Sequence, residues 1–568
     1  MAVNKSYDNL NRVTSVSASS TVSFNYGYNA ANQRTAMTNA DNTYWSYGYD
    51  SLGQVTSGAK RWSDGTFQAG QQFQYAFDDI GNRKTTAAGG DQWGANLRYA
   101  NYAVNNVNQY TSRTVPGGVD VIGTANSNAT VTVNNQPASR KGAYYDVPVV
   151  LENAASAVWA SLTNLAVLNN GTNLDITTNF AGNIFLPQTP ESFSYDADGN
   201  LTQDGRWTYG WDAENRLTNM TSLSTAPTGS KRKLDFVYDF QGRRIQKIVS
   251  TNNGAAYYPQ STNLFVYDGW NLIAVLRPPS SVLQSFVWGL DLSGSMEGAG
   301  GVGGLLAIND AINGAHFAAC DGNGNIAALV KGTDGTTSAL YEYGPFGEVI
   351  RATGPMGKAN PFRFSTKYQD DETDVLYYGH RYYNSSTGRW LSRDPIEQRG
   401  GLNLYVFVEN DPVARLDING LISPRRPGQR KDPYDPPNLG RPCPAKCRPC
   451  KIKASVLDSG SSSEAFKMKL DFNREGCCRD IEIRWTACIN PAGYGTLEGC
   501  NDSTECTFHH GTPPGCYGAW EIGIFIRFLS CEGCKWQIGP GVTLAMKCWE
   551  KPDRWPWPPF TGGKWICE

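Results

Sequence analysis

Aromatic and polar residues alternate in short runs over most of the chain, and many of these runs end in Asp. Such alternation is typical of a strand that buries one face. The Asp side chain can hydrogen-bond the turn backbone, and a Gly or Asn three residues later supplies the positive φ of a tight turn. We therefore predict β-hairpins at these units, which include Tyr7-Asp8, Tyr49-Asp50, Phe77-Asp78, Tyr195-Asp196, Trp211-Asp212 and Tyr238-Asp239.

The units follow one another in tandem, and a single hairpin is only marginally stable in water. Successive hairpins must then pair edge to edge and bury their aromatic faces together. Because strands twist, a long sheet of this kind has to coil. The 60 glycines and the aromatic content of 12% agree with many short strands joined by tight turns. The sequence predicts an all-β fold built on a coiled sheet.

Two stretches interrupt the repeats. Between residues 115 and 190, short alternating runs at 131–135, 144–151 and 164–168 are spaced like the strands of a small sandwich, and this stretch looks like an inserted Ig-like domain. The second stretch is a glycine-rich run at 298–304. No Lys-Ser/Thr pair follows it, so we interpret it as a hairpin connection rather than a phosphate-binding loop.

The most specific stretch lies between residues 341 and 421. It contains Tyr341-Glu-Tyr343-Gly344-Pro345-Phe346-Gly347, Gly379-His380-Arg381-Tyr382-Tyr383, Arg393-Asp394-Pro395-Ile396 and Asp417-Ile-Asn-Gly420-Leu421. This pattern is similar to the Rhs repeat-associated core. Together with the upstream Tyr-Asp units, it makes the chain resemble a YD-repeat (Rhs-family) protein of the polymorphic toxin type.

The resemblance implies a hollow shell of YD repeats whose one end is closed by the core segment. The variable C-terminal region of such proteins is often a toxin held inside. Many members also cut themselves just after the core with two aspartates of Asp-Pro-x-Gly motifs, and two close carboxylates can share the roles of acid and base. The resemblance places cleavage between Leu421 and Ile422, with Asp394 and Asp417 as the catalytic pair.

This chain departs from the family motifs at two positions, because Glu397 replaces the first Gly and Ile418 replaces the second Pro. Both carboxylates are retained, and we expect Arg393 to lie beside them and keep one ionised. The alternative is that both aspartates only cap turns. We expect His380, in an aromatic strand, to be structural.

The composition changes after residue 421. Residues 422–440 are polar and rich in proline, which predicts a linker. Beyond them, alternating or apolar runs at 466–472 and 522–528 predict strands of a separate β domain. No nuclease, protease or other catalytic signature accompanies these strands. His509 and His510 beside Glu505 are interpreted as a loop, so the activity of this domain is left open.

Nearly all cysteines fall in this tail, and only Cys320 precedes it. In an exported protein such density predicts a disulfide framework. A metal site at the two Cys-x-x-Cys pairs is the weaker alternative because the pairs are far apart. The odd number leaves one thiol unpaired, or bonded to Cys320 or to another chain. The disulfide candidates are Cys443, Cys447, Cys450, Cys477, Cys478, Cys488, Cys500, Cys506, Cys516, Cys531, Cys534, Cys548 and Cys567.

Charge and hydropathy limit the kinds of partner that we expect for the chain. A formal net charge of -2 argues against nucleic-acid binding by the shell. The sequence contains no run of about 18 apolar residues, so we predict no membrane-spanning helix. Met1 to Asp8 lie inside a repeat and carry no signal peptide. We expect the chain to be a piece of a longer secreted or cell-surface protein whose export signal lies upstream, and we expect no cofactor.

These observations predict six segments and one function. The segments are YD repeats at 1–114, the Ig-like insertion at 115–190, YD repeats at 191–340, the core at 341–421, the linker at 422–440 and the cysteine-rich domain at 441–568. The shell is expected to enclose and present its own C-terminal domain as cargo, with a target cell surface or an immunity protein as further partners. The alternative is a non-catalytic structural or adhesive protein with a disulfide-stabilised tail.

Overall fold

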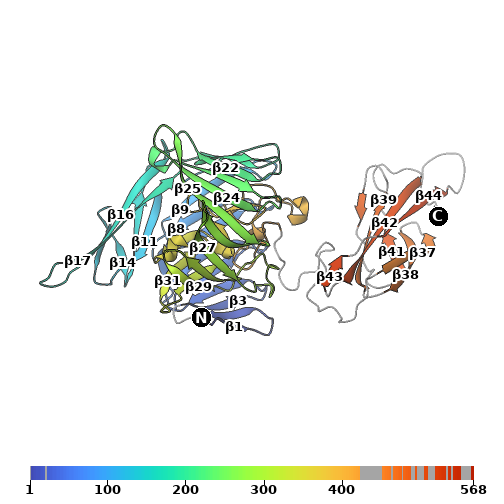
Figure 1. The fold of residues 1–568 in the computed structure, drawn as a ribbon, viewed down its shortest axis with the longest axis horizontal. Coiled ribbons are helices and arrows are strands. Elements are labelled where there is room, and N and C mark those ends of the chain that lie inside the picture. The colour runs from blue at the N-terminus through green and yellow to red at the C-terminus, as the bar shows by residue number, and fades with distance from the viewer. Residues whose placement is uncertain are drawn as a thin grey trace. The chain divides into compact units, whose positions relative to one another are not determined.

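A computed structural model describes residues 2–18 and 22–421, together with the strands of the tail. The chain divides into two compact units, Met1–Arg426 and Pro427–Glu568. Figure 1 shows both units as β structures, and each is described by itself below. In the tail the described residues are 451–461, 465–475, 478–487, 493–495, 505–509, 519–532, 535–538, 542–551 and 564–567.

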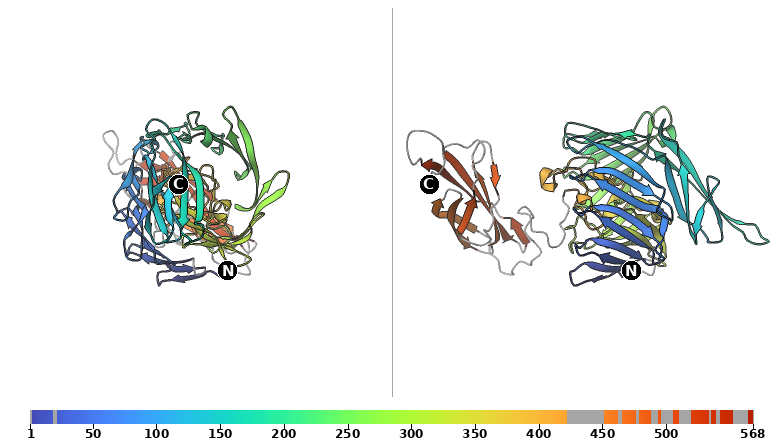
Figure 2. Two further views of the ribbon diagram at one scale, coloured as in Figure 1. Left: turned by 90° about the vertical axis from the view of Figure 1, so that its left-hand side faces the viewer. Right: turned by 180° about the vertical axis from the view of Figure 1, so that it is seen from behind.

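The first wall of the larger unit is an 11-stranded antiparallel sheet in which neighbours in sequence are neighbours in space up to β10, with β18 added at the end. Figure 2 shows these strands stacked side by side. The strands are β1 (Asn4–Tyr7), β2 (Val13–Ser17), β3 (Ser23–Tyr28), β4 (Arg34–Asn39), β5 (Tyr44–Tyr49), β6 (Val55–Arg61), β7 (Phe67–Phe77), β8 (Arg83–Gly89), β9 (Leu97–Val104), β10 (Tyr110–Arg113) and β18 (Glu191–Ser192).

The second wall is a 14-stranded sheet in strict sequence order. Its strands are β19 (Ser194–Tyr195), β20 (Leu201–Gln203), β21 (Trp207–Trp211), β22 (Leu217–Ser222), β23 (Arg232–Tyr238), β24 (Arg244–Asn252), β25 (Tyr257–Asp268), β26 (Asn271–Arg277), β27 (Ser281–Trp288), β28 (Leu305–Asp310), β29 (Gly314–Cys320), β30 (Ile326–Lys331), β31 (Thr337–Tyr343) and β32 (Val349–Thr353), with the 3-10 turn η1 (Thr228–Ser230) before β23.

The repeated turns have the chemistry that the sequence predicts. Asp239 Oδ1 accepts the backbone N–H groups of Gln241 and Arg243, both at 2.9 Å, and Gly242 has a φ of 81°. In the Asn variant, Asn215 takes the left-handed conformation at a φ of 58°. The expectation of tandem hairpins is therefore confirmed.

A second contact recurs between consecutive hairpins and was not predicted. The aromatic residue before the turn donates from its ring to a backbone carbonyl on the preceding hairpin. Such bonds run from Tyr28 to Val13, Tyr49 to Arg34, Trp211 to Leu201, Tyr238 to Leu217, Tyr267 to Arg244, Trp288 to Leu272 and Tyr343 to Ile326. Each hairpin is thus tied to the one before it by a side chain as well as by the strand ladder.

The inserted segment forms two small antiparallel sheets that share one core, centred on Val131, Val133 and Val147. It is tied to β7, because the Tyr144 hydroxyl donates to the carbonyl of Ala69 at 2.5 Å. Its assignment as Ig-like stays a prediction. The strands are β11 (Gly118–Thr124), β14 (Ser139–Lys141) and β15 (Tyr144–Val150) in one sheet, and β12 (Thr130–Val133), β13 (Gln136–Pro137), β16 (Val158–Leu168) and β17 (Ile176–Leu186) in the other.

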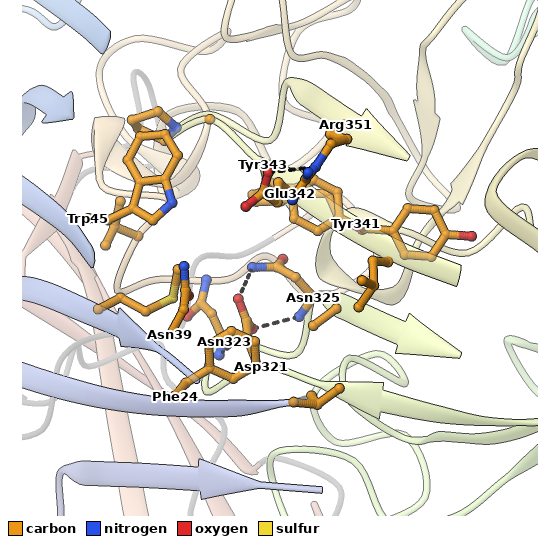
Figure 3. A pocket seen from close by; sticks show the side chains of 18 of the residues that line it. Phe24, Asn39, Trp45, Asp321, Asn323, Asn325, Tyr341, Glu342, Tyr343 and Arg351 are labelled. Atoms are coloured by element: carbon orange, nitrogen blue, oxygen red, sulfur yellow. Dashed lines mark hydrogen bonds and ion pairs between the residues drawn. The ribbon is translucent and has the colours of Figure 1, made fainter. Parts of the chain in front are cut away.

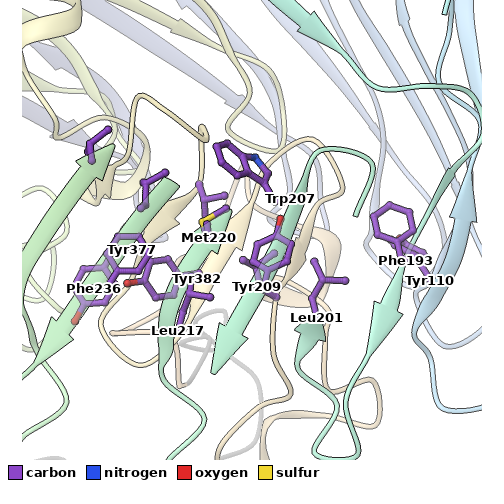
Figure 4. Packing of buried hydrophobic residues seen from close by; sticks show 14 residues of the cluster. Tyr110, Phe193, Leu201, Trp207, Tyr209, Leu217, Met220, Phe236, Tyr377 and Tyr382 are labelled. Carbon is purple, nitrogen blue, oxygen red and sulfur yellow. The ribbon is translucent and has the colours of Figure 1, made fainter. Parts of the chain in front are cut away.

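The segment after β32 packs its aromatic residues against the walls. Tyr377, Tyr382 and Leu391 join a buried cluster that also holds residues of the second wall and Tyr110 of the first, as Figure 4 shows. Val413 of this segment, together with Phe346 from the turn between β31 and β32, packs with Val55 and Tyr75 of the first wall. The elements are α1 (Met356–Ala359), η2 (Phe364–Thr366), β33 (Tyr368–Gln369), β34 (Leu376–Tyr377), β35 (Tyr382–Asn384), β36 (Arg389–Trp390), η3 (Glu397–Gly400) and η4 (Val408–Asn410).

The tail unit consists of strands in its described parts, and β38 and β42 cover the two runs from which strands were predicted. Residues 422–450, which include the predicted linker, lie outside the described residues. One sheet has β37 (Lys451–Ser461), β38 (Ala465–Glu475) and β41 (Glu505–His509); the other has β39 (Cys478–Ala487), β40 (Gly493–Gly495), β42 (Ala519–Glu532), β43 (Lys535–Ile538), β44 (Val542–Lys551) and β45 (Lys564–Cys567).

Within the part of the chain that the structure describes, no helix has the length and apolar character needed to cross a membrane. The same residues contain no group of three or more His, Cys, Asp or Glu side chains arranged to hold a metal ion.

Candidate self-cleavage site

The two predicted aspartates come together around one arginine. Asp394 follows β36, Asp417 lies in the last described turns, and Arg381 directly precedes β35. The Arg381 Nη2 atom lies 2.9 Å from Asp394 Oδ2 and 3.5 Å from Asp417 Oδ2. The side chains of Arg381, Asp394 and Asp417 are only 2%, 8% and 4% exposed. A single buried cation is therefore shared by two buried carboxylates.

Asp417 also binds the backbone of the segment that follows it. Its Oδ1 atom accepts the N–H groups of Gly420 at 2.7 Å and of Leu421 at 2.9 Å. Gly420 has a φ of 79°, in the left-handed region that favours glycine, so the chain turns back toward the carboxylate there. The Arg381 Nε–H donates to the Gly420 carbonyl at 2.5 Å. The backbone up to Leu421 is thus fixed beside both carboxylates.

The electrostatics favour a proton on Asp417 at mildly acidic pH. Burial raises the pKa of Asp417 to about 6, against the lowering effects of Arg381, Lys367 and the Gly420 N–H, while Asp394 raises it further. Burial likewise raises the pKa of Asp394, and Arg381 opposes this increase. Asp394 lies closer to the guanidinium and is less deeply buried than Asp417. Asp394 is therefore the better candidate for the ionised partner.

Three further residues were predicted for this site: Arg393, Leu421 and Ile422. Arg393 is exposed and its Nε–H donates to the carbonyl of Asp198, so the ion pairs with the two aspartates are made by Arg381 and not by Arg393. Leu421 is bonded to Asp417 as described above. Ile422, on the far side of the predicted cut, lies outside the described residues.

Sequence reasoning missed Arg381 although a signal for it was present. Its neighbours Tyr378, Tyr382 and Tyr383 are buried aromatic residues, and an arginine in such a strand needs a carboxylate partner when it is buried. His380, the preceding residue, packs its ring at 4.7 Å from that of Trp270, which agrees with the structural role expected for it.

Cys320 is a free thiol, and burial raises its pKa to about 12. It therefore holds little thiolate at neutral pH and reacts slowly in disulfide exchange. In the tail, the backbone register pairs Cys548 with Cys567 on neighbouring strands. The described tail strands contain Cys478, Cys506, Cys531, Cys548 and Cys567, while Cys443, Cys447, Cys450, Cys477, Cys488, Cys500, Cys516 and Cys534 lie outside the described residues. The disulfide framework stays a prediction.

A cavity of about 380 Å³ lies between β3 to β5 of the first wall and β30 to β31 of the second, lined by Trp45, Phe24 and Tyr341 (Figure 3). Two of its polar side chains are already bonded within the protein. The Asp321 Oδ2 atom accepts from Asn325, and the Asn323 amide donates to the carbonyl of Pro412, both at 2.8 Å. We therefore interpret the cavity as a seam between the walls and not as a ligand site.

Two family models match the chain. The teneurin YD-shell model matches residues 175–413, and the RHS repeat model matches residues 28–66. Over these residues the chain is similar to the YD-repeat (Rhs) family, in agreement with the resemblance seen in the sequence motifs.

Several curated relatives are bacterial toxins or nucleases. The chain is 32% identical over 238 residues to the tRNA3(Ser)-specific nuclease WapA of Bacillus spizizenii, which covers 40% of this chain and 9% of the relative. It is 29% identical over 257 residues to the double-stranded DNA deaminase toxin A of Burkholderia cenocepacia, covering 42% and 17%. It is 41% identical over 91 residues to toxin subunit YenC2 of Yersinia entomophaga, covering 16% and 9%. The chain spans less than a fifth of the length of each.

Among solved structures, the crystal structure of TcdB2-TccC3-Cdc42 matches 74% of this chain and 20% of that chain, with 16% sequence identity and a TM-score of 0.34. At this level of similarity nothing about the site is taken from that assembly.

Proposed function

We propose that this chain is the shell of a polymorphic toxin: it encloses and presents its C-terminal domain as an effector and releases it by cutting itself after Leu421. One observation carries the proposal. Two buried aspartates share Arg381, and one of them binds the backbone N–H groups directly before the proposed cut. Turn capping alone would not require a second carboxylate on the same guanidinium.

The reaction is hydrolysis of the peptide bond between Leu421 and Ile422. Asp394, ionised beside Arg381, takes a proton from water, and the water oxygen bonds to the Leu421 carbonyl carbon. The C–N bond then breaks, and Asp417 gives its proton to the departing amine of Ile422. The products are a carboxylate at Leu421 and an amine at Ile422, and no cofactor is needed.

The pH dependence follows from these roles. Asp417 must hold its proton, and its pKa is raised to about 6, so we expect the cleavage rate to fall as the pH rises through that value. The rate must also fall at low pH, where Asp394 becomes protonated and can no longer accept a proton. A time course of cleavage after cell-free synthesis, in buffers of different pH, measures this bell-shaped profile. A rate that rises steadily with pH would contradict the assignment of acid and base.

The primary experiment is intact-mass measurement of the recombinant chain, with and without reductant. We expect two species, ending at Leu421 and beginning at Ile422, and a single uncut chain for Asp394→Asn, because the amide cannot serve as the base. The matched control is Asp196→Asn in a repeat turn, where Asp196 Oδ1 accepts the N–H of Asn200 at 2.8 Å. The structure shows that Asn fills this role, since Asn29 Oδ1 accepts the N–H of Gln33 at 3.0 Å in an equivalent turn.

The same measurement decides between the two functions. A wild-type chain that stays uncut would reject self-cleavage and favour a non-catalytic structural or adhesive protein. Growth of a bacterium that expresses residues 422–568 alone tests the effector role, and growth at the normal rate would argue against a toxin that acts inside cells. The relatives named as nuclease, deaminase toxin and toxin subunit support this proposal, as does the separate tail unit.

The proposed surroundings of the protein follow from the toxin role. We infer that the chain acts as a secreted or cell-surface protein and that an immunity protein or a target cell surface is its external partner. A formal net charge of -2 gives the chain no overall attraction for nucleic acid.

A further inference from the structure

Lys367 is a buried cation that joins two distant parts of the shell. It directly follows η2 and is 6% exposed. Its ammonium group donates to the Gly300 carbonyl at 2.7 Å and approaches Asn419 Oδ1 at 3.4 Å. Lys367 therefore connects the glycine-rich run at 298–304 to the last turn before the proposed cut.

The glycine-rich run is itself held in a defined conformation. The Asp291 Oδ2 atom accepts the N–H groups of Ala299 at 2.6 Å and Gly301 at 3.2 Å. Gly300 has a φ of 63°, and a Cβ atom there would lie 2.8 Å from Asn419 Oδ1 and 3.2 Å from Lys367 Nζ. Only glycine allows this approach. The run that the sequence marks as a simple connection thus forms one side of the cleavage site.

The segment before the cut is gripped from two sides. On one side the core provides the His380 N–H, which donates to the Asn419 carbonyl at 3.0 Å, and the Arg381 bond to Gly420. On the other side Lys367, whose ammonium group is also bonded to Gly300 of the glycine-rich run, reaches the Asn419 side chain. Lys367 is neither the acid nor the base of the reaction described above, although its charge lowers the pKa of Asp417.

We propose that Lys367 is a positioning residue for self-cleavage: its ammonium group, anchored to Gly300, holds Asn419 so that the following peptide bonds lie against the two aspartates. This inference rests on the proposed function. It gives the glycine-rich run a role in the reaction, although the run is far from the aspartates in sequence.

The charge of Lys367 adds a measurable signature. Asp417 and Asp291 are the carboxylates that act on it and raise its pKa, while burial lowers that pKa to about 8; the ring of Tyr378 lies 5.3 Å away. Lys367 in turn lowers the pKa of Asp417, as do Arg381 and the Gly420 N–H. Replacing the ammonium with a neutral group must therefore raise the pKa of Asp417.

The test compares Lys367→Met with Lys367→Arg in the full chain, by time courses of intact mass after cell-free synthesis over a range of pH. For Lys367→Met we expect a lower maximal cleavage rate. We also expect the alkaline limb of the profile, where the cleavage rate falls as the pH rises, to move upward by about one pH unit, a typical effect of losing a nearby opposite charge. Lys367→Arg keeps the charge and should restore the position of the limb.

The outcomes separate this inference from the proposed function. A wild-type chain that is never cut would reject the function itself. If the wild type is cut and Lys367→Met is cut at the maximal rate of the wild type, the positioning role is wrong, whether or not the pH profile shifts. Should Lys367→Met fail to fold, Asn419→Gly decides: glycine tolerates the φ of 58° at this position but lacks the side chain that Lys367 holds. Its cleavage should slow with the alkaline limb unmoved, and an unchanged rate would overturn the proposal.

Discussion

At the scale of single residues, the core segment is fastened to the second wall by Arg244. This arginine is 1% exposed and lies within 6 Å of five aromatic ring centroids, those of Phe236, Phe265, Tyr368, Tyr377 and Tyr382. Its guanidinium pairs with Asp370 at 2.6 Å, and Lys247 pairs with the same carboxylate at 2.8 Å. Two buried cations of β24 thus share Asp370 of the core, and Lys247 also pairs with Glu372 at 3.0 Å.

We expect Asp370→Asn to lower the free energy of unfolding of the shell by about 3–5 kcal/mol, because the buried Arg244 would lose its carboxylate partner and Lys247 would keep only Glu372. Urea unfolding followed by tryptophan fluorescence measures this loss. The control is Asp64→Asn, which breaks an ion pair with Lys141 whose side chains are 53% and 48% exposed. An exposed pair of this kind contributes little to stability because solvent screens it. Equal losses in the two variants would contradict the role given to Asp370.

The residue scale also shows where sequence reasoning stops. The aspartate pair was predictable because family motifs mark both members, although they lie far apart in the chain. Arg381 was missed and Arg393 was chosen because proximity in sequence says little about which side chain a fold turns inward. Arg393 is adjacent to Asp394, yet it points to Asp198 at the surface. Burial and pairing depend on tertiary contacts that no local pattern contains.

At the scale of elements, the hairpin is a unit with two kinds of attachment. Its turns were predictable, since Asp capping and the left-handed Gly or Asn are local in sequence. The ring-to-carbonyl bonds between hairpins were not predicted, although the spacing of the tyrosines is visible. The reason is that a carbonyl acceptor has no signature in sequence, because every residue carries one.

The tyrosine bonds can be tested one at a time. Tyr28→Phe removes the bond from the Tyr28 hydroxyl to the carbonyl of Val13, which is 2.7 Å long, and should lower the free energy of unfolding by about 1 kcal/mol. The matched control is Tyr99→Phe, at a tyrosine that is 59% exposed, and it should change stability much less. Hydrogen exchange at β2 and β3 locates the effect. Unchanged exchange there would show that the bond contributes nothing to the attachment.

At the scale of the whole shell, the segment that carries the proposed cleavage site is attached to both walls. Arg389 of β36 reaches the first wall, where it donates to Asn82 Oδ1 and to the carbonyl of Asn108, and its guanidinium lies 3.8 Å from the centroid of the Tyr110 ring. Arg389 makes no described contact with either aspartate. Nevertheless it fixes the strand that leads into Asp394.

We therefore expect Arg389→Met to lower the fraction of cut chain although the aspartates and Arg381 are intact. Intact-mass measurement after a fixed time gives this fraction, and Arg399→Met, at an exposed arginine of the same segment, is the control that should be cut normally. Full cleavage of Arg389→Met would mean that the site forms without its attachment to the first wall.

The bonds between hairpins have a direction. Every ring hydroxyl or indole N–H named above reaches back to a strand that precedes it in the chain, so a hairpin leaving the ribosome finds its acceptor already made. The hairpins of the shell can therefore fold one after another during synthesis. The candidate site residues Arg381, Asp394 and Asp417 are made only after the hairpins that precede them in the chain. The proposed self-cleavage would therefore begin only after the hairpins that support its site have folded.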